Sequence, residues 1–191
     1  DALTDADFNV ALGEFALSAD TLGSRTTALG TGALANQNFT TATDTYNTAV
    51  GYTAGNSVTT GTDNTLIGGL SGDAITDGNT NTAVGSYSLT TNQRGDRNTA
   101  IGFESLKAMN PSGDVDTYNT AVGYQSGLAV TTGVSNTLIG GLAGDAITTA
   151  SNSTALGYAA LGAAQTSGNN TAIGSLAGDA ITGANNTAIG Y

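Results

Sequence analysis

The nine residues NTAVGYTAG at positions 47–55 return as NTAVGYQSG at positions 119–127, seventy-two residues later. Close variants of this pattern occur nine more times, and each copy contains one glycine that serves as an anchor. The anchors lie 17 residues apart, except for two spacings of 21 and a last one of 16. They are Gly13, Gly30, Gly51, Gly68, Gly85, Gly102, Gly123, Gly140, Gly157, Gly174 and Gly190. Such a period indicates a repeat protein in which each copy forms one structural unit.

The residues before each anchor follow the pattern of a short strand. Asn stands four positions before the glycine in nine of the eleven copies, Thr three before in ten, and Ile, Val or Leu immediately before in all. Successive side chains of a strand point to opposite faces. Thr48 and Val50 therefore share one face, while Asn47, Ala49 and Gly51 share the other. Each copy is predicted to be a strand with a β-branched face and a small-residue face.

When copies stack, equivalent residues form rows along the stack. Identical Asn side chains one copy apart can hydrogen-bond to one another along such a row, and rows of Gly, Ala and Ser let another backbone approach closely. The predicted structural ladder comprises Asn47, Thr48, Val50, Gly51, Asn64, Thr65, Ile67, Gly68, Asn119, Thr120, Val122 and Gly123. Aromatic residues follow several anchors, and they either seal a seam between chains or cover an end of the roll. They are Tyr52, Phe103, Tyr124 and Tyr158.

A second, weaker strand is expected later in each repeat. The candidates are residues 57–60, 74–76, 129–132, 146–148 and 180–182. A strand–helix–strand unit needs about 30 residues, and no stretch shows a sustained helical period. The sequence therefore predicts an all-β parallel β-solenoid, or β-roll, that spans 1–191 as a single repeat domain. It would have about eleven coils of 17 residues, two of them extended to 21, and would be roughly 50 Å long at the usual strand spacing.

The two longer coils carry their extra residues in ANQNFTTATDTY (35–46) and KAMNPSGDVDTY (107–118). Residues 45–76 match 117–148 at 25 of 32 positions, so the insertions recur four coils apart. Both are predicted to be loops that protrude from the same edge of the rod, about 19 Å from each other. The candidate contact residues in these loops are Phe39, Tyr46, Met109, Pro111 and Tyr118.

The composition restricts partners and assembly. A net charge of -11 repels a phosphate backbone, so nucleic acid is not expected as a partner. No apolar run reaches the length of a membrane span, so this segment is not expected to insert into a membrane. Each coil offers only two aliphatic residues for burial, one before the anchor glycine and one on the second strand. Because this is little for a narrow roll, self-association is expected to bury the remaining apolar face.

Few residues offer catalytic or metal chemistry. The chain has no His or Cys, which removes the usual bases, thiol nucleophiles and imidazole ligands. Asp114 and Asp116 are the candidate acid–base pair, but they lie in a loop where acidic residues commonly form turns. Asp73, Asp145 and Asp179 share the context Gly-Asp-Ala-Ile-Thr; calcium needs six or more oxygen ligands, so they are interpreted as turn residues. No enzyme, metal site or cofactor is expected, and a polysaccharide hydrolase is kept only as an alternative.

The repeats also resemble a known family. NNTAIGSLAG (169–178), NTAVGYQSG and NSTALGYAAL (152–161) resemble repeats in the head domains of trimeric autotransporter adhesins of the YadA type and in bacteriophage tail fibres. This resemblance implies a left-handed β-roll packed as a homotrimer. It also implies a structural or adhesive fibre segment of a longer protein, located outside a cell or on a virion. The implied partner is a host-surface receptor, glycan or matrix, and no binding residue transfers from the family.

An ice-binding β-solenoid is a second interpretation of the same pattern. NTAxG resembles the repeats of a plant ice-binding β-roll, and a regular row of threonine hydroxyls and methyls on a flat face is what ice-binding proteins present. Each coil offers one Thr in this row, beside the aliphatic residue that should point the same way. The Thr row could therefore lie outside, inside or at a seam between chains.

Overall fold

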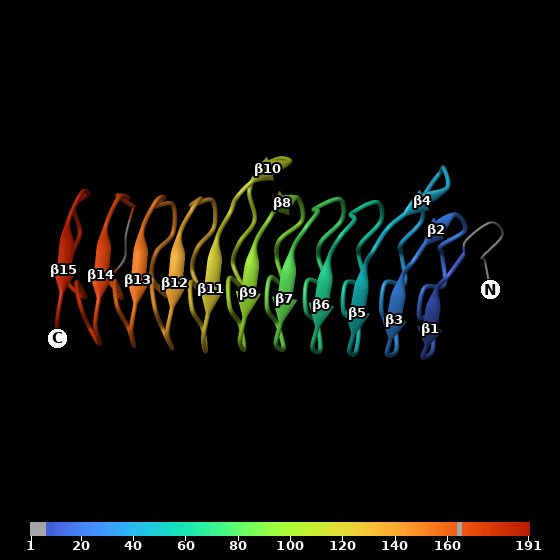
Figure 1. Ribbon diagram of the computed structural model, residues 1–191, viewed down its shortest axis with the longest axis horizontal. Coiled ribbons are helices and arrows are strands. Elements are labelled where there is room, and N and C mark those ends of the chain that lie inside the picture. Colours follow the sequence, from blue (N-terminus) through green and yellow to red (C-terminus); the bar gives the residue numbers. More distant parts are fainter. Residues whose placement is uncertain (1–6, 164–165) are drawn as a thin grey trace.

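A computed structural model describes residues 7–163 and 166–191 of the chain. Over these residues it is a parallel β-solenoid without any helix, as the repeat predicts. Successive coils stack side by side into a straight rod with the two termini at opposite ends (Figure 1). The strands are β1 (Val10–Leu12), β2 (Gly23–Ser24), β3 (Thr27–Leu29), β4 (Thr43–Asp44), β5 (Thr48–Val50), β6 (Thr65–Ile67), β7 (Thr82–Val84), β8 (Gly95–Asp96), β9 (Thr99–Ile101), β10 (Val115–Asp116), β11 (Thr120–Val122), β12 (Thr137–Ile139), β13 (Thr154–Leu156), β14 (Thr171–Ile173) and β15 (Thr187–Ile189).

The three-residue strand before each anchor glycine belongs to one eleven-stranded sheet. Its order is β1-β3-β5-β6-β7-β9-β11-β12-β13-β14-β15, and every pairing is parallel. Thr48 pairs with Thr65, and Thr65 pairs with Thr82. The residue rows expected from the sequence are therefore in register along the rod.

In the main sheet from β3 to β14, the middle residue of each strand is buried in the core. Ala28, Ala49 and Ala83 are fully buried, and Leu66 and Leu138 occupy this position in two coils. The larger Leu66 fits because glycines lie beside it: a Cβ atom on Gly55 would be 2.6 Å from Leu66 Cδ1, and one on Gly72 would be 2.7 Å from Leu66 Cδ2. A larger residue in the middle of the strand is thus matched by glycine at the neighbouring core positions, which keeps the interior close-packed.

The aliphatic residue before each anchor glycine does not lie in the core, so the prediction that it is buried is wrong. Ile67, Ile101 and Ile139 are 37%, 38% and 38% exposed. A strand of three residues has its first and third side chains on one face. Because the narrow interior takes the small middle residue, the Thr and aliphatic rows both face outward.

The predicted second strands are also wrong, because those segments form turns. Val58 N donates to Gly55 O at 3.0 Å, a bond that closes a turn within the coil. Single hydrogen bonds then join adjacent coils, such as Thr59 N to Thr76 O at 2.8 Å. Among residues 7–163 and 166–191, residue 147 takes part in an isolated bridge without a strand around it.

The corners of the coils use left-handed backbone at residues other than glycine. Tyr46, five before an anchor, has φ 50°; Thr53, two after, has φ 50°; and Leu89, four after, has φ 50°. Such conformations are uncommon outside glycine and cost on the order of 1 kcal/mol or more each. They persist because ladder hydrogen bonds on both sides hold each corner in place.

Neighbouring coils approach most closely at the anchor glycines. Gly68 has φ 130°, and a Cβ atom there would lie 2.7 Å from both C and O of Gly85 in the next coil. The rows of Ala and Ser three residues further on are likewise inside the chain, with Ala54, Ser71 and Ser88 buried. These small rows were expected to admit a partner backbone, but the backbone that approaches the glycines belongs to the next coil of the same chain.

A buried row of Asn side chains links the coils. Asn64 Oδ1 accepts from Asn81 N at 3.0 Å, and Asn64 Nδ2 donates to Gly78 O at 2.9 Å. The same pair of bonds recurs along the rod, for example at Asn119 with Asn136 N and Gly133 O. The expected amide-to-amide ladder is present only in places, such as Asn98 Nδ2 to Asn81 Oδ1 at 3.1 Å. The row mainly satisfies main-chain groups that the left-handed corners leave buried.

The two insertions protrude from the same edge of the rod, as predicted. β4 pairs with β2 of the preceding coil, and β10 pairs with β8, each as a parallel two-stranded sheet. Figure 1 shows both small sheets at the upper edge, β2 and β4 near the N-terminal end and β8 and β10 near the middle.

Candidate functional site

The candidate contact residues divide into buried and exposed sets. Phe39 is 7% exposed, Met109 is fully buried and Pro111 is buried, so these three side chains are not presented at the surface of the single chain. Met109 belongs to the hydrophobic core, and Pro111 packs beside Gly95, where a Cβ atom would lie 3.1 Å from Pro111 Cγ. Tyr46 and Tyr118 are 54% and 52% exposed and lie at the outer corners where the insertions rejoin the coil.

Each exposed Tyr belongs to a cluster with one Arg and one Asp. In the first corner, defined as Arg25, Asp44 and Tyr46, Asp44 Oδ1 lies 2.9 Å from Arg25 Nε and Asp44 Oδ2 accepts from the Tyr46 hydroxyl at 3.4 Å. The Arg25 guanidinium lies 5.9 Å from the centre of the Tyr46 ring. The carboxylate is therefore held between a cation and a phenol.

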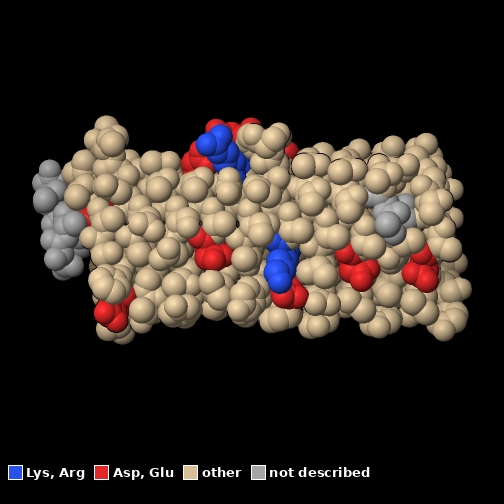
Figure 2. Space-filling view, turned by 180° about the vertical axis from the view of Figure 1, so that it is seen from behind, with Lys and Arg blue, Asp and Glu red and all other residues tan. Residues whose placement is uncertain are grey.

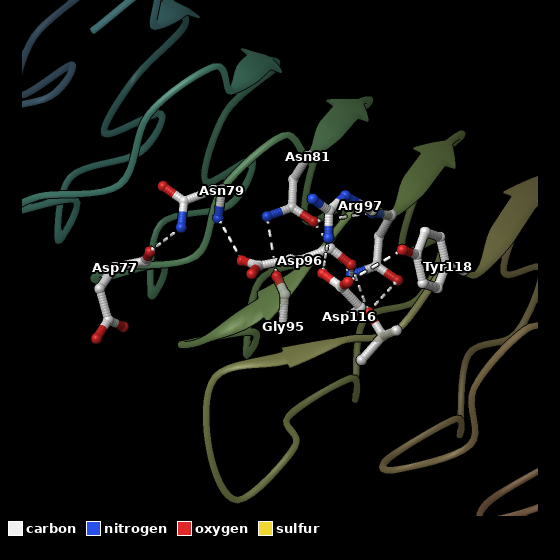
Figure 3. A network of polar contacts seen from close by, with 10 residues as sticks. Asp77, Asn79, Asn81, Gly95, Asp96, Arg97, Asp116 and Tyr118 are labelled. Atoms are coloured by element: carbon white, nitrogen blue, oxygen red, sulfur yellow. Dashed lines mark hydrogen bonds and ion pairs between the residues drawn. The ribbon is translucent and has the colours of Figure 1, made fainter.

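The second corner, defined as Arg97, Asp116 and Tyr118, has the same arrangement four strands further along the main sheet. Arg97 pairs with Asp116 Oδ1, and Asp116 Oδ2 accepts from the Tyr118 hydroxyl at 3.0 Å. The guanidinium lies 5.6 Å from the centre of the Tyr118 ring. Figure 3 shows these three side chains meeting beside β8 and β10.

Main-chain and amide contacts fix the strand beneath the second corner. Asp96 Oδ1 accepts from Asn79 N at 2.6 Å, and Asn81 Nδ2 donates to Gly95 O at 2.9 Å (Figure 3). Both contacts come from the preceding coil and reach β8. Arg97 directly follows β8. These hydrogen bonds therefore fix the main chain from which the Arg97 side chain extends.

A buried polar cluster beneath the first corner was not foreseen from the sequence. Gln37 Nε2 donates to Asp20 Oδ2 at 2.7 Å and to Thr26 Oγ1 at 2.9 Å, and Asn47 Nδ2 donates to Gln37 Oε1 at 2.8 Å. Asp20, Thr26 and Gln37 are all fully buried. The sequence signal for this cluster is Thr26, which stands where most coils have Asn. Gln37 from the insertion supplies an amide group beside Thr26 instead.

The two carboxylates considered for acid–base chemistry have different surroundings. Asp116 is engaged by Arg97 and Tyr118, while Asp114 lies exposed in the loop. Asp116 is therefore a member of the second corner, and its hydrogen bonds account for its position without any catalytic role.

Two of the three Asp residues in the Gly-Asp-Ala-Ile-Thr contexts, Asp145 and Asp179, lie near the same glycine. A Cβ atom on Gly162 would lie 2.8 Å from Asp179 Oδ1 and 3.7 Å from Asp145 Oδ1, so both carboxylates face the space over this glycine. Burial raises the pKa of Asp145, and the charge of Asp179 raises it further, against hydrogen bonds from the main chain at Ala146 and Asp145. Burial likewise raises the pKa of Asp73, whose Oδ1 has no hydrogen-bond partner.

Asp145→Asn is expected to raise the melting temperature at pH 7. A raised pKa in the folded state means that the folded chain binds the proton more tightly than the unfolded chain, so stability falls as the pH rises from about 4 through the folded pKa. Asn removes that loss and still accepts main-chain hydrogen bonds. The gain should therefore shrink towards pH 3, as measured by thermal unfolding across pH. Asp114→Asn, which removes one exposed charge, is the control, and an equal gain from both variants would contradict burial as the cause.

The largest exposed apolar surface runs the length of the rod. We define the apolar band as the outward aliphatic row of the main sheet together with the aromatic or Leu side chains one or two residues after the anchors. Its corner members are Phe15, Tyr52, Leu70, Tyr87, Phe103, Tyr124, Leu142, Tyr158, Leu176 and Tyr191. Phe103 stacks on Tyr124 with ring centres 5.7 Å apart and meets Tyr87 edge-on at 6.1 Å.

The outward positions of the main sheet carry no charged residue in any coil. Charged residues lie beside the apolar band at its corner. There Glu104 accepts from Lys107 at 2.6 Å and from Gln125 at 2.7 Å, and the Lys107 hydrogen bond contributes most to lowering the pKa of Glu104. The apolar band is thus an uncharged surface with a polar margin.

Nothing matches this chain among protein-family models, curated proteins or solved structures. Within residues 7–163 and 166–191, no three acidic side chains lie close enough together to hold a metal ion. The same residues contain no helix with the length and apolar character needed to cross a membrane. The two corners and the apolar band are the candidate functional surfaces of the chain.

Proposed function

We propose that this chain is a structural or adhesive fibre segment that associates with copies of itself, as a trimer, through the apolar band. The exposed aliphatic row of the main sheet is the observation that carries the proposal. Large exposed apolar patches on soluble proteins mark interaction sites. The resemblance of the repeats to adhesin heads and tail fibres supports the same assembly and an extracellular or virion location.

The size of the apolar band suits an interface. The apolar band is eleven strands long, with about 4.8 Å between strands, and about five residues wide, at about 3.3 Å per residue. Its area is therefore roughly 800 Å². Each partner of a stable complex commonly buries about 800 Å². Because the apolar band repeats once per coil over the whole rod, an occupant that covers it must itself be long, straight and periodic. A second copy of the chain meets all three requirements.

Charge supports a side-by-side assembly of acidic chains. The chain carries -11 net charge, which would oppose association if the charges met at the seam. The face seen in Figure 2, turned away from the viewer of Figure 1, carries scattered acidic side chains and two groups with Lys or Arg, separated by uncharged surface. The outward positions of the main sheet have none, so copies that meet there keep their charges apart.

Wild-type chain is expected to sediment at about three times the monomer mass of 18.7 kDa. Ile101→Asp should shift it to the monomer, because Ile101 is 38% exposed at the centre of the main sheet and a charge there would be buried without a partner in the seam. Thr60→Asp, an exposed position outside the apolar band, should leave the assembly unchanged. A wild-type monomer that is stable on dilution would refute self-association. A trimer of the Ile101 variant would refute the assigned seam.

An ice-binding role is the second candidate, and the outward Thr row favours it. Thr48, Thr65 and Thr82 are aligned strand by strand on the outer face of the sheet. Strand spacing of about 4.8 Å gives their hydroxyl and methyl groups a regular repeat. The adjacent row is aliphatic, however, which suits protein contact better. Thermal hysteresis of ice growth at micromolar protein would favour this candidate, and normal ice growth would remove it.

A further inference from the structure

The two 21-residue coils differ in most residues but keep the members of both corners. Comparison of 18–25 with 90–97 and of 35–46 with 107–118 leaves six identical pairs among twenty positions. They are Gly23/Gly95, Arg25/Arg97, Asn38/Asn110, Asp44/Asp116, Thr45/Thr117 and Tyr46/Tyr118. The Gly and Thr pairs are buried. Of the four exposed pairs, three are the Arg, Asp and Tyr that meet in the corners.

Stability does not account for this retention. The Arg25 and Asp44 side chains are 44% and 48% exposed, and those of Arg97 and Asp116 are 47% and 42% exposed. Exposed ion pairs contribute about 0–1 kcal/mol, and exposed cation–π contacts about 0.5–1 kcal/mol. The insertions before residues 44 and 116 have changed at most positions without losing their fold, whereas the Asp and Tyr begin a run that is identical in both coils, 44–52 and 116–124. The Arg lies outside that run, and its retention beside the same Asp and Tyr is better explained by what the three side chains contact together.

The chemistry of each corner suits a sugar. A guanidinium has five N–H donors and a carboxylate has about four lone-pair sites, so the ion pair and the Tyr hydroxyl leave several of them open to solvent. The corner therefore offers donors, acceptors and a partly exposed aromatic ring within one small area. Sugar hydroxyls both donate and accept, and the C–H face of a sugar packs on an aromatic ring.

Charge narrows the class of sugar. Each corner pairs one Arg with one Asp, the charge of Asp7 also reaches Arg25, and the chain as a whole carries -11. That field repels polyanionic glycans at long range. On these grounds we propose that the two corners are equivalent binding sites for a neutral polysaccharide, an inference that rests on the adhesive role proposed above and gives its ligand class and residues.

The first corner shows how a ring can add to such a site. Phe8 lies over the Arg25 guanidinium with its centre 5.1 Å away, on the coil that precedes Arg25. The equivalent position at the second corner is Thr80, which also stands five residues before its anchor. An apolar ring face can therefore pack on the Arg plane, and at the second corner that place is open to a ligand. The second corner is expected to make the larger contribution to binding.

The repeat makes the pair of sites bivalent. Four strand spacings separate the corners by about 19 Å along one straight edge (Figure 1). A polymer of identical units can occupy both sites at once. Linked sites of this kind gain roughly 10²–10⁴ in overall affinity over a single site when the geometry allows both to engage.

The test measures binding of the full chain to immobilised mannan, dextran and galactan, with hyaluronan as the anionic comparator. At least one neutral polysaccharide should bind, and more tightly than hyaluronan. Tyr46→Ala should weaken binding at least tenfold, Tyr118→Ala by more, and the double variant should abolish it. Thr60→Ala is the control, because Thr60 is exposed but lies outside both the corners and the apolar band. Thermal unfolding of each variant confirms that the fold is kept.

Three results would overturn the inference: no binding to any neutral polysaccharide, tighter binding to hyaluronan, or a folded double variant that binds like wild type. Sedimentation of the same samples separates this failure from failure of the proposed assembly. A trimer that binds no polysaccharide refutes only the corner sites. A monomer that binds through Tyr46 and Tyr118 refutes only the self-association.

Discussion

Gly68→Ala is expected to lower the free energy of unfolding by about 3 kcal/mol or more. The glycine has φ 130°, a region in which a side chain costs about 1–3 kcal/mol. The new Cβ atom would also lie 2.7 Å from the Gly85 carbonyl group, which is main chain and cannot move without disturbing the next coil. For a chain of this length, 3 kcal/mol corresponds to a fall of about 6–12 °C in melting temperature.

The matched control is Gly113→Ala in the second insertion. No atom lies within 4 Å of a Cβ placed on Gly113, and its φ is not in the left-handed region. This variant should melt within about 2 °C of wild type, because surface changes away from special backbone are usually within ±0.5 kcal/mol. Equal melting of the two variants would show that the anchor glycines are not needed for the close approach of coils.

Asn64→Leu is expected to cost about 2–6 kcal/mol. Asn64 is fully buried, and its amide serves Asn81 N and Gly78 O, two main-chain groups in the next coil. Leu has similar size but leaves both groups buried without a partner, at about 1–3 kcal/mol each. Denaturant unfolding, with the slope checked against wild type, gives the value directly.

The chain itself suggests the matched variant, because Ser153 takes the Asn position in one coil. Its Oγ still accepts from Asn170 N, at 3.4 Å. Asn64→Ser should therefore keep the acceptor, lose the donor to Gly78 O and fall between wild type and Asn64→Leu. If the Ser and Leu variants were equally stable, the buried Asn row would be a packing feature and not a hydrogen-bonding one.

The period of the anchors was enough to predict the coils and their register. A fixed 17-residue spacing allows only one alignment in which Thr48, Thr65 and Thr82 share a row, and the sheet has that alignment. Strand alternation also correctly placed Thr48 and Val50 on one face. It did not say which face is inside, because β-branched residues usually fill a core. The decisive signal was Leu66, which fits inside only because Gly55 and Gly72 lie beside it.

The turns could not be predicted from turn residues. Such residues place left-handed backbone at Gly or Asn, yet Leu34 and Leu89 adopt it with their side chains fully buried. The main-chain hydrogen bonds to the coils on either side impose this conformation. These hydrogen bonds join residues far apart in the sequence, so the residues of the turn alone do not reveal it. For the same reason the edge from which the insertions protrude was predictable, whereas the burial of Phe39 and Met109 was not.

The residues of the two corners were also only partly predictable from the sequence. Tyr46 and Tyr118 were found as candidate contacts because they end both insertions. Arg25 and Arg97 were missed, since each lies 19 residues earlier in the chain than its Asp partner, Asp44 or Asp116. They meet only because β2 pairs with β4, and β8 with β10, across adjacent coils. Comparing the segments that precede the two insertions, 18–25 and 90–97, position by position would have shown the retained Arg.

Every pairing in the main sheet joins residues that are 16, 17 or 21 apart, as in Thr171 with Thr187, Thr48 with Thr65 and Thr27 with Thr48. Structures in which each repeat contacts only its neighbours can form at any point and propagate from there. A chain that leaves a ribosome N-terminus first can therefore complete each coil as soon as the next segment emerges.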